Sequence, residues 1–130
     1  MEDDFIHLLL TDAALAGLVA DRINWNHQPQ DIGSPAIALY VIASTPNYTF
    51  RGQSGLTSTV VQLDTRALTY PSAISVRDAL KTRISGFRGT IGATCFAGIF
   101  VRQERQNSDR PGTELFHRIS LDAEIWHSPA

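Results

Sequence analysis

Cysteine is almost absent from the sequence, and so are the histidine patterns of local metal sites. The single cysteine, Cys95, cannot form a disulfide within the chain, which is compatible with synthesis in a reducing cytoplasm. None of the 4 histidines is followed two to four positions further along by a second histidine or a cysteine. The 130 residues must therefore rely on a hydrophobic core, and at this length we expect a single domain that spans residues 1–130.

Lysine is also nearly missing, because ten of the 11 basic residues are arginine and only Lys81 is lysine. The 13 acidic residues give a formal net charge of -2, which argues against the broad positive surface that grips nucleic acid. Arginine is favoured at protein interfaces, since its guanidinium forms bidentate pairs and is weakly hydrated. A codon bias towards arginine would produce the same composition.

Long apolar runs are absent as well. No stretch approaches the roughly 18 apolar residues that span a bilayer, so we expect no membrane association. The first residues, MEDDFIHLLL, place three acids where a secretory signal carries basic residues, so we do not expect export by that route.

The motifs of phosphate binding and catalysis are missing too. RGQSGLTS, residues 51–58, contains two glycines, but Leu56 follows Gly55 where a P-loop requires lysine. No GxSxG motif or local carboxylate pair points to hydrolysis. We therefore expect no enzyme, no cofactor and no metal site. The glycines instead favour a hairpin loop between two strands.

Apolar residues at helical spacing predict two principal helices. The first covers 2–20 and is kinked or split, with Thr11 as a possible N-cap of its second part. The second covers 73–87 and follows Ser72 as N-cap. Its apolar face is formed by Ala73, Val76, Leu80, Ile84 and Phe87.

Alternation of apolar and polar residues predicts strands in 22–26, 36–44, 58–68, 95–105 and 115–126. In 36–44 both faces are apolar, since Ile37, Leu39 and Val41 alternate with Tyr40 and Ile42. Such a strand is buried on both faces, and so small a chain cannot cover both by itself, which points to a partner subunit. The order α-β-β-β-α-β-β predicts an α+β fold, a mainly antiparallel sheet of about five strands with two helices packed on it.

Two polar segments, 47–55 and 106–113, link strands that we expect to be adjacent. Polar loops on rigid hairpins are common binding devices, although these two could equally be solvated turns. Residues in and beside the first segment that could contact a neighbouring subunit or ring are Arg51, Gln53, Ser54 and Leu56. Those in and beside the second segment are Arg105, Asn107, Asp109 and Arg110.

In order and spacing, these features resemble the tail-completion or tail-terminator proteins of long-tailed bacteriophages and gene transfer agents. The resembling segments cover nearly the whole chain: LVADRINWN, PAIALYVIAS, YTFRGQSGLTSTVVQLDTRALTY, AISVRDALKTRISGFRGT and FHRISLDAEIWH. The most specific parts are the aromatic-GxSGL loop that leads into a VQLD strand, and the final SLDxxIWH.

The resemblance implies a structural virion protein without catalysis or cofactor. Its subunits would form a ring, usually of six, which caps the head-proximal end of the tail tube, ends tube polymerisation and joins the tail to the head or neck. The implied partners are further copies of the chain, the tail tube protein and a stopper or adaptor protein of the neck, with DNA only as passing cargo. The implied location is the head–tail joint of a virion or phage-like particle, after assembly in the bacterial cytoplasm.

Three alternatives remain at this stage, one of which is a generic intracellular adaptor with an unknown host partner. The chain could be another neck component, such as a stopper or adaptor. Less favoured is a small-ligand-binding module built on the loop that contains Gly52 and Gly55.

Overall fold

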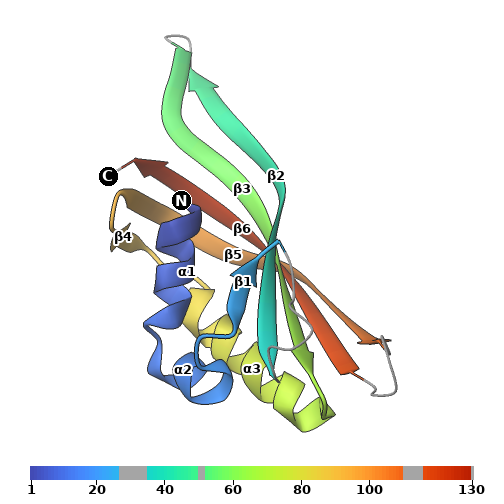
Figure 1. The fold of residues 1–130 in the computed structure, drawn as a ribbon. Coiled ribbons are helices and arrows are strands. Elements are labelled where there is room, and N and C mark those ends of the chain that lie inside the picture. Colours follow the sequence, from blue (N-terminus) through green and yellow to red (C-terminus); the bar gives the residue numbers. More distant parts are fainter. Residues whose placement is uncertain (27–34, 50–51, 110–115, 130) are drawn as a thin grey trace.

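The computed structural model describes residues 1–26, 35–49, 52–109 and 116–129 (Figure 1). Within them the chain forms three helices and six strands. The helices are α1 (Glu2–Leu10), α2 (Ala13–Val19) and α3 (Tyr70–Ile84). The strands are β1 (Ile23–Trp25), β2 (Ala36–Thr49), β3 (Gly52–Ala67), β4 (Gly89–Ile91), β5 (Thr94–Asp109) and β6 (Phe116–Pro129). The α+β prediction is confirmed.

The strands form one sheet in the order β1-β2-β3-β6-β5-β4. Every neighbouring pair is antiparallel except β1 and β2, which run parallel. The sequence prediction missed β4, because three residues after a helix carry too little alternation to identify a strand. No helix among the described residues is long and apolar enough to span a bilayer.

The strands also run further than predicted, and the expected loops 47–55 and 106–113 are in part strand. β2 and β3 stay paired to Thr49–Gly52, and β5 and β6 stay paired to Asp109–Phe116. Pro46 lies where β2 is an edge strand, a position in a sheet that tolerates proline, which lacks an N–H.

The first helical segment is split, as expected, but Asp12 rather than Thr11 caps α2. The Asp12 carboxylate accepts a hydrogen bond from Leu15 N at 3.1 Å, whereas the Thr11 hydroxyl donates back to His7 O at 2.8 Å and ends α1. α3 begins earlier than predicted because Thr69, rather than Ser72, is its N-cap. The Thr69 hydroxyl accepts from Ser72 N at 3.3 Å.

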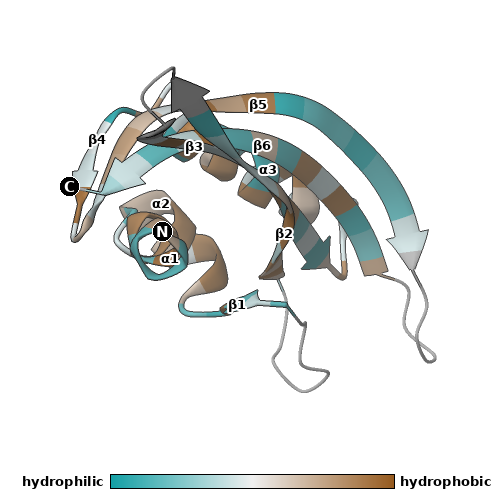
Figure 2. Cartoon of the chain, turned by 90° about the horizontal axis from the view of Figure 1, so that it is seen from above, coloured by the Kyte–Doolittle hydropathy of each residue, from teal (hydrophilic) through white to brown (hydrophobic). Residues whose placement is uncertain are grey.

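The helices cover one face of the sheet, which curls around them (Figure 2). The core between the two layers contains Phe5, Leu8 and Leu9 of α1. It also contains the predicted apolar faces of α3 and β6, whose fully or almost fully buried members include Ala73, Val76, Leu80, Ile84, Leu121, Ala123 and Ile125. We call the opposite face of the sheet, which no described helix covers, the outer face.

The two long hairpins extend from opposite ends of the sheet (Figure 1). At one end, β2 and β3 continue past the last β3–β6 pair, Thr57–His127. We call this extension, residues 46–49 and 52–57, the arm. At the other end, the β5–β6 hairpin finishes with the pair Asp109–Phe116, and we call residues 107–109 and 116–118 the tip.

Candidate subunit interface

The outer face carries a set of arginine–carboxylate pairs that link β3, β6 and β5. Strand alternation places them there, because every second residue of β6 from Arg118 to Glu124 points away from the helices. Asp64 is only 5% exposed. Its carboxylate accepts hydrogen bonds from Arg118, at 2.8 Å, and from the Ser120 hydroxyl. The pairs are Arg118–Asp64, Arg105–Asp122 and Arg102–Glu124.

These pairs cancel their charges locally. Arg105 donates two hydrogen bonds to Asp122, at 2.7 and 3.0 Å, and they raise the pKa of the guanidinium. A hydrogen bond from Arg102 lowers the pKa of Glu124 below its ordinary value. The arginines of these three pairs are therefore neutralised within the subunit and do not supply the unpaired positive field that binding to a DNA backbone requires.

A further ion cluster lies on the helix-covered side and connects α3 with β5. Lys81 and Arg77, one turn apart on α3, both contact the carboxylate of Glu104. The pKa of Glu104 falls to about 2, chiefly through the hydrogen bond from Lys81. The distal half of β5 is thus held to the domain through side chains.

One edge of the sheet is formed by β2, and most of that edge is open. β1 pairs with β2 only from Ile37 to Leu39. Between Tyr40 and Pro46, no described strand lies on that side. Val41 is 41% exposed and Ile42 56% exposed.

Only the first half of the apolar strand predicted over 36–44 is buried within the single chain, which agrees with the expectation that one copy cannot cover both of its faces. Ala36, Ile37, Ala38 and Leu39 are buried, whereas the residues that follow lie beyond the reach of β1.

The opposite edge is formed by β5, and it is open in the same way. β4 pairs only with Thr94 to Phe96, and Gly86 N donates to Ile99 O at 2.8 Å. From Phe100 to Ser108, no strand in the described ranges pairs with the edge of β5 that lies away from β6. The Phe100 ring is 44% exposed and lies under the Arg102 guanidinium, 5.1 Å from it.

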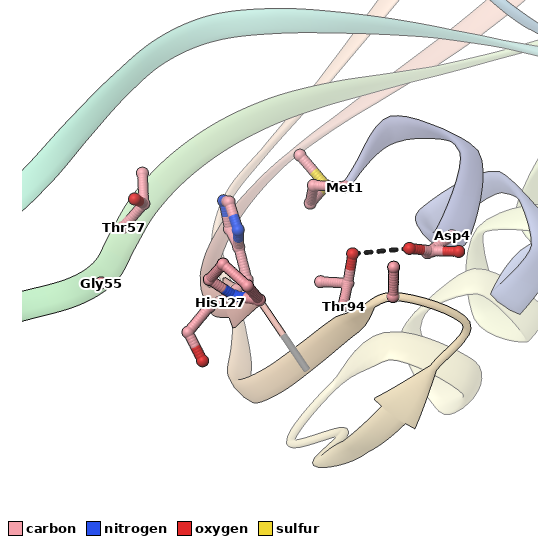
Figure 3. Close-up of a pocket in the computed structure, with 9 residues that line it drawn as sticks. Met1, Asp4, Gly55, Thr57, Thr94 and His127 are labelled. Atoms are coloured by element: carbon pink, nitrogen blue, oxygen red, sulfur yellow. Dashed lines mark hydrogen bonds between the residues drawn. The ribbon is translucent and has the colours of Figure 1, made fainter.

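An open hollow of about 590 Å³ lies where the arm meets the body of the domain. Figure 3 shows His127 between the β3 residues Gly55 and Thr57 and the body residues Met1 and Thr94. Thr94 donates to Asp4 at 2.6 Å. The carboxylate of Asp4 in its wall disfavours a phosphate ligand, and the described residues contain no group of three potential metal ligands.

His127 connects this hollow with the root of the arm. Its Nε2 lies 2.8 Å from the Thr59 hydroxyl, which in turn lies 3.1 Å from the Ser44 hydroxyl. Burial lowers the pKa of His127, so the neutral imidazole is favoured. These contacts between side chains link β6, β3 and β2 at the level where the arm begins.

The structure separates the two groups of predicted interface residues. Leu56 lies partly buried on the arm, whereas Arg105 and the exposed Asn107 lie on β5, towards the tip at the other end of the sheet. Gln53, Ser54 and Asp109 belong to strands by their backbone, and Arg51 and Arg110 lie outside the described residues.

The eight residues predicted for the interface do not include the apolar side chains on the open edges, Val41, Ile42 and Phe100, although the strand that carries Val41 and Ile42 was predicted to meet a partner subunit. One available signal was the absence of any charged residue from Ala36 to Thr49.

Comparison with known proteins identifies the family. Residues 4–128 match the family described as Tail completion protein gp17. No curated protein sequence matches the chain significantly. Among solved structures, the chain is similar to one from the virion of a native gene transfer agent (GTA) particle. The two share 17% sequence identity with a TM-score of 0.74, over 98% of this chain and 94% of that chain, which shows a common fold. Because the family match covers nearly the whole chain, the protein belongs to the tail completion protein gp17 family, a family of structural virion components.

Proposed function

We propose that copies of the protein form a ring that caps the head-proximal end of the tail tube. The ring ends tube polymerisation and joins the tail to a stopper or adaptor protein of the neck. The observation that carries this proposal, together with family membership, is the placement of the arm and the tip at opposite ends of one sheet.

Such a placement suits a connector, which must bind different proteins above and below it. The arm and the tip are each formed by paired strands, so each can hold a protruding binding surface in a fixed orientation. Leu56 on the arm, and Asn107 near the tip, are positioned to contact different partners in the stack.

The charge distribution also fits a channel for DNA. A wall with unpaired arginines would retain the passing strand, because neutralising phosphates releases counterions. The three arginines that pair with Asp64, Asp122 and Glu124 on the outer face are already neutralised within the subunit. We therefore propose that DNA passes through the ring as cargo, at the head–tail joint of a particle assembled in the bacterial cytoplasm.

This role requires no chemical step, and we propose that the protein is not an enzyme. A phosphate-binding module on Gly52 and Gly55 is less favoured. These glycines belong to a strand paired with β2, whereas a phosphate-binding loop leads into a helix N-terminus.

A capping assay tests the proposal directly. Purified protein is added to the tail tube protein of the same particle while the tubes elongate, and tube length is followed by electron microscopy. We expect elongation to stop and density to appear at one end of each tube. Uncapped tubes of unchanged length would contradict the terminator role, and binding to the isolated neck alone would assign the protein to the stopper or adaptor position.

A further inference from the structure

The sheet has two open edges that run in opposite directions. β2 forms one edge and β5 the other, with β3 and β6 between them. Each of the three contacts in this series is antiparallel, so strand direction alternates from β2 to β5. A β2 strand placed beside β5 of another copy, in the same sheet orientation, would therefore continue the antiparallel pattern.

The two edges are irregular at the same level of the sheet. β2 has a bulge at Ile42, and β5 has a bulge at Arg102. The residues that precede the two bulges belong to a single cross-strand row, Val41–Val61–Ala123–Val101. The adjacent row joins Ala43 to Phe100 through Val60 and Glu124.

The open part of the β2 edge, from Tyr40 to Thr45, lacks the charged side chains of edges that must stay unpaired. Monomeric proteins protect an exposed edge strand with charged side chains, especially lysine. β2 has no charged residue over its whole length, and it exposes Val41 and Ile42. β5 does carry charges, but those of Glu104, Arg102 and Arg105 are paired with α3 or β6. Both edges can therefore lose water without leaving an unpaired charge.

We propose that β5 of one copy pairs with β2 of the next copy, so that the sheet continues from subunit to subunit. This inference rests on the proposed ring and names the contact that closes it. In a ring whose axis runs along the strands, copies are related by rotation without translation, so segments at one level meet. The contact is then centred on Phe100–Gln103 of one copy and Val41–Ala43 of its neighbour.

Pairing of β2 with β2 would be the other way to cover the apolar edge. It would bury Ile42 across a two-fold axis and stop at a dimer, which would leave the β5 edge open. The heterologous pairing uses both edges of every copy and can close into a ring.

Disulfide trapping in assembled particles tests the pairing. Opposite residues of an antiparallel pair have Cα atoms about 4.5 to 5.5 Å apart, within the range that a disulfide bridges. In a Cys95→Ser background, Ala43→Cys is combined with Phe100→Cys, which share one cross-strand row, and expressed in cells that lack the native gene. Under oxidation we expect a ladder of covalent multimers from the double variant. A mixture of the two single variants should give only covalent heterodimers, because each copy then carries a single cysteine. A second combination, Val41→Cys with Val101→Cys, uses the adjacent row and preserves the test if the first variant fails to fold.

The matched control combines Leu10→Cys with Leu68→Cys, which replace exposed apolar residues away from both edges. No ladder is expected from it. Joined particles in which neither edge combination gives more multimer than this control would overturn the pairing but leave the proposed function intact. Covalent dimers formed by the Ile42→Cys variant alone would overturn the β5–β2 pairing in favour of a β2–β2 contact. Particles that assemble and join normally without the native gene would overturn the proposed function, and with it the ring on which the pairing rests.

Discussion

Glu104 provides a quantitative test of how the long β5 strand is held to the domain. Its carboxylate contacts Lys81 and, at 3.0 Å, Arg77, both on α3. The hydrogen bond from Lys81 is the main cause of a pKa that falls from 4.5 to about 2. Replacing Glu104 with glutamine removes the charge but keeps the shape and an acceptor oxygen.

The expected loss of stability follows from this difference in pKa. At about 1.36 kcal/mol per pKa unit, the drop corresponds to an upper limit of about 3.4 kcal/mol. Lys81 is 40% exposed, so solvent screens its attraction to the carboxylate. We therefore expect Glu104→Gln to lower the free energy of unfolding by about 1 to 2 kcal/mol at pH 7.

The pH dependence has a definite sign. Because the folded-state pKa lies below the unfolded value of 4.5, the contribution is fully present above that pH and is lost as the pH falls towards about 2. Urea unfolding of both proteins between pH 7 and pH 3 should show the stability gap narrowing below pH 4.5. Glu124→Gln, whose partner Arg102 is 59% exposed, is the matched control and should cost less. A gap for Glu104→Gln that is absent at pH 7, or equal at every pH, would refute the reasoning.

Three further changes test other parts of the structure. Asp12→Ala removes the cap on Leu15 N and should cost about 1 kcal/mol in urea unfolding, whereas Asp12→Ser should recover most of it. Because burial lowers the pKa of His127, stability should decline as the pH falls through about 6.5 towards the folded-state value, and His127→Gln should flatten that region of the profile. The double reversal Arg51→Glu and Arg110→Glu should weaken head-to-tail joining in particles without changing the unfolding curve, and normal joining would contradict their assignment to an interface.

The sequence predicted those elements whose pattern is set by burial against the core. β6 alternates strictly, and Val76, Leu80 and Ile84 of α3 recur at helical spacing, so their inward faces could be identified from the letters alone. The caps at Thr69 and Asp12 were misplaced by one to three residues, because several adjacent hydroxyl and carboxyl residues could each accept the same hydrogen bond.

The surface features depend on strand register, which a single sequence does not specify. The pairing of Asp64 with Arg118 joins residues 54 positions apart and exists only because Asp64 and Ser120 are opposite one another. The open edges likewise follow from how far β1 and β4 extend. Sequence reasoning could note that β2 is apolar on both faces and lacks charge, but not that Val41 and Ile42 lie beyond the end of β1.

The central claim is that this protein ends the tail and joins it to the head. The most direct measurement is to delete its gene from the source element and image the resulting particles by electron microscopy. The account predicts separate DNA-filled heads together with tails of uncontrolled length. Tails of normal length that fail to join would move the protein into the neck, and normal joined particles would contradict the account.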